Sequence, residues 1–302
     1  MEAKFKIDMH IHSSNSDGRK NPYEVIDLAA QLGMEKIVFT DHSGVTFSDE
    51  LYQYALKKNI DIPLMGLEVS TIHEGNKYHI LCYGRNLRNP ELQDYLMYPT
   101  KVKNDVFIKI INGLHENGIL IPSTEEILKG VTQEGTYKHP DRWMLTRTLI
   151  ASYVANQLGI DIDKAKSLFS KGKYPKEQII FVENQMPKEE KYLPTIDVIK
   201  KMRNYGAGVI LAHPWWECGR GNDVHTVKKD IETFINAGLL GLEMQSYHMS
   251  DEYMEAGKEL FNEFPDLFAI GGSDYHGDHR SFIGDRGVTL EEYNKFLEVI
   301  TV

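Results

Sequence analysis

Short apolar segments alternate with helical patterns at both ends of this chain, and histidine or acidic residues follow several of the apolar segments. Apolar and polar residues alternate from Phe5 to Ile11, which is the period of a half-buried strand. Asn21 and Pro22 then suit the cap and the first residue of a helix. The same alternation of strand and helix resumes near Thr195. We expect strands near Phe5, Ile37, Leu64, Tyr78, Val209, Leu240 and Phe268.

This order of elements indicates an α/β fold with a mainly parallel sheet. The polar residues lie at or just after the strands, which is where parallel α/β folds hold their active sites. An open doubly wound sheet and a small or irregular barrel both agree with the order of elements. A barrel explains better why polar residues from the first and last strands would need to meet.

The first strand places two histidines on one face. His10 and His12 project to the same side of a strand, so both imidazoles point at one spot. Asp17 and Gly18 follow in a turn rich in serine and asparagine, which would return a carboxylate toward that spot. Neutral imidazole is the commonest side-chain ligand for a transition metal, so this stretch suggests a metal site. Taken alone, the two histidines agree equally well with a half-buried strand in which they pack and form hydrogen bonds.

Metal-capable residues recur at the ends of the other expected strands. Each has an ordinary alternative, since Asp17 could serve a turn, His42 and His213 could cap strand ends, and Glu68 could pair with an arginine. Together they are numerous enough for two or three ions, above all if Glu68 bridges two of them. Nitrogen and oxygen ligands suit manganese, iron or zinc. The candidate ligands are His10, His12, Asp17, His42, Glu68, His79, His213, Asp274 and His276.

Composition limits the classes of protein to which the chain can belong. Its 302 residues, 41% of them hydrophobic, suffice for one large domain or one domain with a sizeable insertion. Cys82 and Cys218 form neither a disulfide framework nor a paired-cysteine zinc motif. A net charge of -10 argues against broad binding to nucleic-acid backbones, although a local basic patch could hold one phosphorylated substrate. The chain has no apolar run of membrane-spanning length and no signal-peptide pattern, so we expect a cytoplasmic protein without a membrane partner.

The middle of the chain carries long helical patterns and few strand signals. We therefore expect a mainly helical insertion over residues 85–191, within a barrel formed by residues 1–84 and 192–302. The expected helices of the insertion are Thr100–Asn117, a short helix opened by the Ser123-x-x-Glu126 capping box, Arg142–Leu158 and Asp161–Phe169.

Several short motifs occur in a fixed order along the chain. They are Asp8-Met9-His10-Ile11-His12-Ser13, Ser16-Asp17-Gly18, Thr40-Asp41-His42, Gly66-Leu67-Glu68, Tyr78-His79, Ala212-His213-Pro214 and Gly272-Ser273-Asp274-Tyr275-His276. This ordered set resembles the motifs of the PHP family, named for polymerase and histidinol phosphatase. The resemblance implies a distorted seven-stranded (β/α) barrel with a metal cluster at the C-terminal ends of its strands. It also implies ligand groups, namely His10, His12, Glu68 and Asp274 for one ion, Glu68, His79 and His213 for a second, and Asp17, His42 and His276 for a third. The position of Asp17 is histidine in some family members.

The expected insertion carries a second resemblance. The run Arg142-Trp143-Met144-Leu145-Thr146-Arg147-Thr148-Leu149 is similar to an Arg-Pro-His-x-Ala-Arg-Ala-Leu motif of PHP phosphoesterases that act on small nucleotides. Both arginines match, Met144 replaces the histidine, and the nearby His139 is out of register. Arg142 and Arg147 could clamp a phosphate, or they could lie solvated on the outer face of an amphipathic helix. Arg19 is a further candidate for a phosphate contact, with an exposed turn residue as its alternative.

These features indicate a metal-dependent phosphoesterase that hydrolyses a phosphomonoester of a small metabolite, for which a nucleotide is one candidate. Clustered divalent ions would activate a water and stabilise charge on the attacking and leaving oxygens. His42, His276 and Asp17 are the candidate catalytic residues, and either histidine could protonate the leaving oxygen if the third ion is absent. The alternatives are an amidohydrolase or lactonase built on the same cluster, and a noncatalytic, metal-stabilised binding domain.

Overall fold

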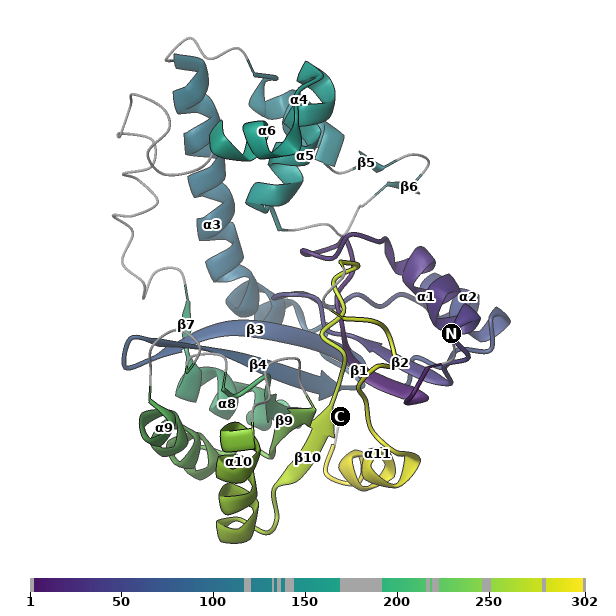
Figure 1. Cartoon of the computed structure of the whole chain (residues 1–302), viewed down its shortest axis with the longest axis vertical. Helices are drawn as coiled ribbons and strands as arrows, with labels where there is room; N and C mark the ends of the chain where they lie inside the picture. The colour runs from purple at the N-terminus through teal and green to yellow at the C-terminus, as the bar shows by residue number, and fades with distance from the viewer. Residues whose placement is uncertain are drawn as a thin grey trace.

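Two sheets of unequal size carry the α/β part of the chain (Figure 1). The computed structural model describes residues 3–116, 121–131, 133–134, 137–138, 144–168, 192–215, 218, 223–245, 251–278 and 281–300. The smaller sheet pairs β1 (Ile7–Ile11) with β2 (Lys36–Phe39) in parallel. The larger sheet contains, in spatial order, β10 (Phe268–Gly271), β9 (Gly241–Gln245), β8 (Gly208–Leu211), β4 (Asn76–Gly84), β3 (Met65–His73) and β7 (Leu193–Pro194).

The strand ladders do not close into a ring within the described residues. Between β1 and the segment that follows β10, pairing is reduced to a single bridge that joins Ile11 to Tyr275. Between the segment that follows β2 and the strand β3, it is reduced to a bridge that joins His42 to Glu68. The expected α/β class is confirmed, whereas the closed seven-stranded barrel stays a prediction.

The strands β3 and β4 form an antiparallel hairpin, so the expectation of parallel pairing is wrong for β4. The connection is Glu74-Gly75, whose φ angles of 46° and 84° are both positive, as a type I′ turn requires. A two-residue turn can join only antiparallel neighbours, because a parallel pair needs a long crossover. β4 also runs antiparallel to β8. The hairpin brings Glu68 on β3 and His79 on β4 into the same region of the sheet.

Helices cover the outer sides of the two sheets (Figure 1). The first begins as the sequence predicted, since the side chain of Asn21 accepts the backbone N–H of Glu24 and the two residues form a capping box. In the described ranges, no helix is both long and apolar enough to span a bilayer. The helices that flank the sheets are α1 (Pro22–Gln31), α2 (Asp49–Lys57), α8 (Thr195–Asn204), α9 (Val224–Asn236), α10 (Asp251–Glu263) and α11 (Leu290–Leu297).

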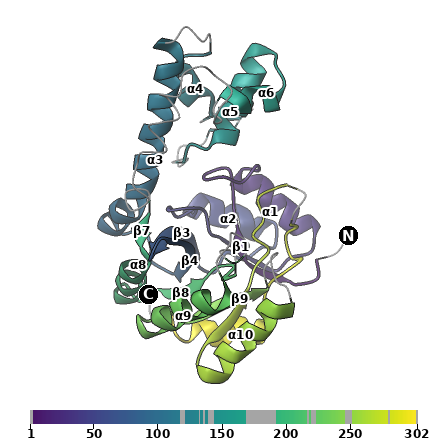
Figure 2. The ribbon, with the colours of Figure 1, turned by 60° about the vertical axis from the view of Figure 1, so that its left-hand side comes forward.

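The middle of the chain forms a helical group with a core of its own. Figure 2 shows α3 leading away from the sheets to the other three helices. Apolar side chains from these helices, among them Ile110, Ile150 and Val154, are fully or nearly fully buried against one another. Helices dominate the described part of this region, while the expected boundaries at residues 85 and 191 stay predictions. The elements are α3 (Pro90–Glu116), α4 (Thr124–Val131), β5 (Gln133–Glu134), β6 (Tyr137–Lys138), α5 (Arg147–Leu158) and α6 (Ile162–Leu168).

Gly272 lies against the backbone of β1, and we expect Gly272→Ala to destabilise the protein by about 1–3 kcal/mol. A Cβ at this position would lie 2.3 Å from the Cβ and 2.5 Å from the backbone nitrogen of His10, so the first strand would have to move. Gly257→Ala is the matched control, because its Cβ would meet only the movable end of Met244, at 2.3 Å. Chemical denaturation of both variants makes the comparison, and equal losses of stability would contradict the expectation.

Candidate metal centre

His10 and His12 point from β1 to the same interior side, as the period of the strand predicted. Both side chains are fully buried, and their Nε2 atoms lie 3.1 Å apart. The Oδ1 atom of Asp274 lies 3.3 Å from Nε2 of His10 and 3.4 Å from Nε2 of His12. Residues from the first strand and from the loop after β10 therefore meet at one point.

Glu68 on β3 lies between two sets of imidazoles. Its Oε2 atom is 3.2 Å from Nε2 of His12 and 3.4 Å from Nδ1 of His42. Its Oε1 atom is 3.0 Å from Nδ1 of His79 and 3.1 Å from Nε2 of His213. The carboxylate is buried, and each of its oxygens faces a different group of nitrogen donors. This is the arrangement that a carboxylate needs in order to bridge two ions.

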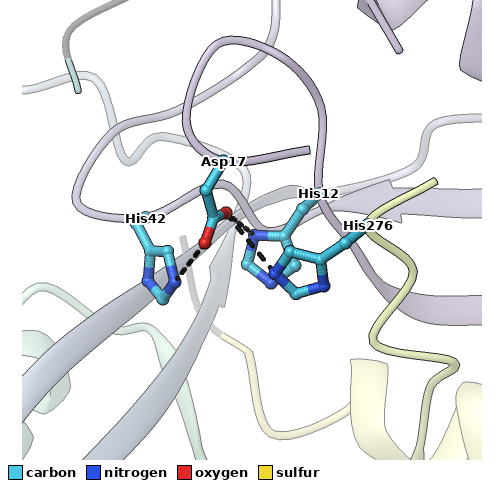
Figure 3. A group of neighbouring side chains, drawn as sticks. All are labelled: His12, Asp17, His42 and His276. Carbon is cyan, nitrogen blue, oxygen red and sulfur yellow. Dashed lines mark ion pairs between the residues drawn. The ribbon is translucent and has the colours of Figure 1, made fainter. Parts of the chain in front are cut away.

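A third group surrounds the carboxylate of Asp17 (Figure 3). Its Oδ1 atom lies 3.5 Å from Nδ1 of His12 and 3.4 Å from Nε2 of His276. Its Oδ2 atom lies 3.5 Å from Nε2 of His42. The turn after β1 thus brings Asp17 back to the histidines, and all nine candidate ligands share one region.

Two of the candidate ligands have a backbone in the left-handed region. The φ angle is 26° at His213 and 52° at Asp274. Residues other than glycine adopt such angles at a cost, although aspartate tolerates them better than most. The backbone N–H of His213 donates to Oε2 of Glu243 over 2.9 Å, which stabilises this conformation. Strain of this kind is concentrated at functional sites.

The buried acids and bases of the cluster shift one another's pKa values. Burial raises the pKa of Glu68, but His79, His42 and His10 outweigh burial and hold it well below its usual range. Burial also raises the pKa of Asp17, which His42 and His276 likewise lower strongly. The carboxylates are therefore ionised at neutral pH and attract cations.

The donor atoms are spaced as a divalent ion requires. With bonds of about 2.1 Å, the ligand atoms of a four- to six-coordinate ion lie about 3.0–3.4 Å apart. The donors of His10, His12 and Asp274 lie 3.1–3.4 Å apart, and Oε1 of Glu68 is 3.0 Å and 3.1 Å from its two imidazole neighbours. In the described part of the chain, the buried Nδ1 atom of His12 forms no hydrogen bond. The residues therefore fit divalent ions, and the assignment of each ligand to an ion stays a prediction.

We expect the metal-free protein to release protons when it binds Zn²⁺ near pH 7.5. Burial lowers the pKa of His12, but hydrogen bonds to Asp274 and Glu68 outweigh burial and raise it to about 10. Without an ion, the ring of His12 is therefore protonated on both nitrogens at neutral pH. An incoming ion must displace one of these protons. The affinity should rise about tenfold per pH unit for each proton released.

Calorimetric titrations with Zn²⁺ in buffers of different protonation enthalpy measure this release. His79 is not expected to contribute, because burial lowers its pKa to about 4 and leaves it neutral. An apparent enthalpy that does not depend on the buffer would contradict the expectation.

The three candidate phosphate-binding arginines are placed only in part. Arg19 is exposed, and its backbone N–H donates to the carbonyl oxygen of His276 over 2.9 Å, which fixes it beside the cluster. Arg142 lies outside the described residues, as does His139. Arg147 is the first residue of α5, and the structure describes its backbone alone. A role in substrate binding stays a prediction for all three arginines.

Two buried carboxylates at this site received no role from the sequence. Glu243 on β9 lies 3.0 Å from Nδ1 of His10, through its Oε1 atom. Asp41 accepts hydrogen bonds from the backbone N–H and the hydroxyl of Ser13. One signal could have revealed Glu243, because it is the single charged residue in the apolar segment from Leu239 to Gln245.

The comparison with protein families agrees with this geometry. Residues 8–115 match the model of the PHP domain family. Over these residues the chain is similar to the PHP domain family. The match runs from β1 into α3 and includes six of the nine candidate ligands, namely His10, His12, Asp17, His42, Glu68 and His79.

Three proteins of known description align with most of this chain. A 5′-3′ exoribonuclease from Haemophilus influenzae is 25% identical over 272 residues, 90% of each chain. A phosphoribosyl 1,2-cyclic phosphate 1,2-diphosphodiesterase from Eggerthella lenta is 26% identical over 277 residues, 89% of this chain and 94% of the relative. A 3′,5′-nucleoside bisphosphate phosphatase from Chromobacterium violaceum is 26% identical over 277 residues, 89% of this chain and 87% of the relative. All three are named for the hydrolysis of phosphate esters.

Two solved structures share the fold. A protein from Bifidobacterium adolescentis assigned as a metal-dependent phosphoesterase superimposes with a TM-score of 0.74 at 20% identity, covering 98% of this chain and 96% of its own. An amidohydrolase from Chromobacterium violaceum superimposes with a TM-score of 0.69 at 22% identity, covering 97% of this chain and 96% of its own. At these identities the two structures support the fold, helical region included, and not a substrate.

Proposed function

We propose that this chain is a metal-dependent phosphoesterase that hydrolyses a phosphomonoester of a small metabolite, with nucleotides as the first class to test. The observation that carries the proposal is the position of Glu68, whose two oxygens lie within 3.0–3.4 Å of four imidazoles. Clusters in which a carboxylate joins two ions are typical of enzymes that hydrolyse phosphate esters. The three relatives named for phosphate-ester hydrolysis support the same reaction class.

The proposed ligands form three overlapping groups. His10, His12, Glu68 and Asp274 would hold one ion, Glu68, His79 and His213 a second, and Asp17, His42 and His276 a third. Manganese, iron or zinc would suit this set of nitrogen and oxygen donors. Bound ions would supply Lewis acidity, which makes water nucleophilic near neutral pH and offsets negative charge on the phosphoryl oxygens.

His276 is the proposed proton donor if the third ion is absent. Its Nδ1 lies 2.9 Å from the carbonyl oxygen of Asp274, and a hydrogen bond donated there directs Nε2 toward Asp17. Burial and His12 lower the pKa of His276, but Asp17 and Asp274 outweigh them and raise it. The imidazolium would thus hold a proton at Nε2 for the leaving oxygen, with Asp17 orienting the ring. His42, which also contacts Asp17, is the alternative donor.

The substrate would reach the cluster of candidate ligands from the side on which ligand side chains are exposed to solvent. Asp17 and His79 are 27% and 29% exposed, whereas His10 and His12 are fully buried. The phosphate of the substrate would therefore meet the exposed side of the cluster. Arg19, Arg142 and Arg147 are proposed to hold substrate phosphates there, because guanidinium groups bind phosphate oxygens in pairs.

A substrate panel tests the proposal. The protein loaded in turn with Mn²⁺, Fe²⁺ or Zn²⁺ would be given 5′-mononucleotides, a nucleoside 3′,5′-bisphosphate, a cyclic phosphodiester and a 5′-phosphorylated oligoribonucleotide. We expect free phosphate from one or more monoesters. If the protein cleaved only diesters, the proposed phosphomonoester specificity would be wrong, while the proposed metal-dependent phosphoesterase chemistry would stand.

The same panel includes an amide and a lactone, because an amidohydrolase shares the fold. Turnover of these compounds without turnover of phosphate esters would assign the cluster to a different hydrolase. Bound metal without turnover of any compound would favour a noncatalytic binding domain.

A further inference from the structure

Glu243 is a fully buried carboxylate that lies behind the cluster and belongs to none of the proposed ligand groups. Its Oε1 atom is 3.0 Å from Nδ1 of His10, and its Oε2 atom accepts the backbone N–H of His213 over 2.9 Å. One side chain on β9 thus contacts β1 at the start of the chain and the segment that follows β8. It touches one member of the first proposed ligand group and one member of the second.

The contact with His10 determines which nitrogen of that ring carries hydrogen. A carboxylate accepts hydrogen bonds and donates none, so Nδ1 of His10 must be the donor. In the neutral ring Nε2 then has a free lone pair. This Nε2 lies 3.1 Å from Nε2 of His12 and 3.3 Å from Oδ1 of Asp274. The lone pair therefore points to the place where the first ion is proposed to bind.

The contact with His213 acts on the backbone. The φ angle of this residue is 26°, which is unfavourable for an L-amino acid. Its N–H is held by the second oxygen of Glu243, while its Nε2 reaches Oε1 of Glu68 at 3.1 Å. The two oxygens of Glu243 thus position residues for two different ions.

We propose that Glu243 is the positioning residue of the metal centre, which sets the tautomer of His10 and the backbone of His213 so that both can act as ligands. This inference rests on the proposed function, because it assumes that the cluster binds divalent ions. A histidine ligand whose second ring nitrogen donates to a carboxylate is better oriented and more basic, and loss of such a partner typically lowers metal affinity about 10- to 100-fold.

Glu243→Gln keeps the shape of the side chain almost unchanged. It can preserve the hydrogen bond from the backbone N–H of His213 while it reverses the hydrogen bond to His10. The amide has a single oxygen, which the fixed N–H of His213 requires as its acceptor. The NH₂ group must then face Nδ1 of His10 as a donor, so the ring has to carry its hydrogen on Nε2. A hydrogen on Nε2 would block the nitrogen lone pair that is proposed to bind the ion. The reverse orientation would leave the buried N–H of His213 without an acceptor.

The test measures the affinity of the protein for Mn²⁺ alone, by competition with a chelator, together with the metal content after desalting. We expect E243Q to bind Mn²⁺ about 10- to 100-fold more weakly than the wild type and to retain fewer ions. Tyr83→Phe is the matched control. The hydroxyl of Tyr83 donates to the carbonyl oxygen of Met9 over 2.8 Å, so its loss removes a buried hydrogen bond from β1, the strand that carries His10. The control should show wild-type affinity, even if both variants lower the melting temperature of the metal-free protein equally.

A double-mutant cycle with His10→Ala identifies the contact responsible. If Glu243 acts through His10, E243Q should lower affinity no more than about twofold in the H10A background, which is the usual error of additivity. Equal Mn²⁺ affinity of E243Q and Y83F would overturn the inference while leaving the metal centre in place. Failure of the wild-type protein to bind Mn²⁺, Fe²⁺ or Zn²⁺ would instead reject the proposed function.

Discussion

Glu68→Gln is expected to lower phosphoesterase activity by more than about 100-fold and to lower the metal content of the purified protein. Removal of an outer-shell partner of a metal ligand lowers metal affinity or activity by up to about 100-fold. Because Glu68 is proposed as a direct ligand, we expect a larger loss of activity. Its two oxygens lie between His12 and His42 on one side and His79 and His213 on the other. An amide keeps the volume but offers one oxygen and no charge, so it cannot join two cations.

Phosphate release on the best substrate of the panel and elemental analysis of the same sample make the measurement. Glu50→Gln is the matched control, because the residue is an exposed glutamate in the first turn of α2. We expect E50Q to keep wild-type activity and metal content. Normal activity and metal content in E68Q would refute the bridging role of Glu68.

Asp41→Ala is expected to destabilise the metal-free protein by about 3 kcal/mol or more, because several buried donors would lose their acceptor. The fully buried carboxylate accepts the backbone N–H of Ser13 at 2.8 Å and its hydroxyl at 2.7 Å. It also accepts the hydroxyls of Ser16 and Thr46, both at 2.5 Å. These bonds hold the turn that carries Asp17, so the variant should also weaken the ligand group around that residue.

Urea denaturation in the presence of a chelator measures the loss, and Asp41→Asn provides the comparison. The amide oxygen of that variant can still accept the N–H of Ser13, and the hydroxyls can rotate to accept from the NH₂ group. We expect a smaller loss, of about 1–2 kcal/mol. If D41A were as stable as D41N, the hydrogen bonds of the carboxylate would not be what holds the turn.

Local signals predicted much of the fold correctly. The capping box of Asn21 and Glu24 begins α1, and Ser123 and Glu126 form the predicted capping interaction before α4. Other boundaries were wrong. α5 begins at Arg147 after its cap Thr146, and not at Arg142. α3 begins at Pro90 and continues past Pro99, a residue at which sequence signals favour a helix end.

The wrong pairing direction expected for β4 has a different origin. The turn Glu74-Gly75 requires positive φ angles at both residues, and glutamate is an uncommon choice there, so the sequence did not reveal the hairpin. Whether the seven strands close into a barrel also depends on single bridges, such as the one between Ile11 and Tyr275, and not on strand propensity. Pairing of this kind is decided by packing between distant segments.

The sequence by itself determined the features that depend on neighbours along the chain. The period of a strand places His10 and His12 on one face, and the turn after it returns Asp17, because both depend on backbone geometry over a few residues. The tertiary structure alone decided that Glu243 faces His10. The two residues are 233 positions apart. No local rule relates such residues, since their contact follows from the order of strands in the sheets and from the packing of the core.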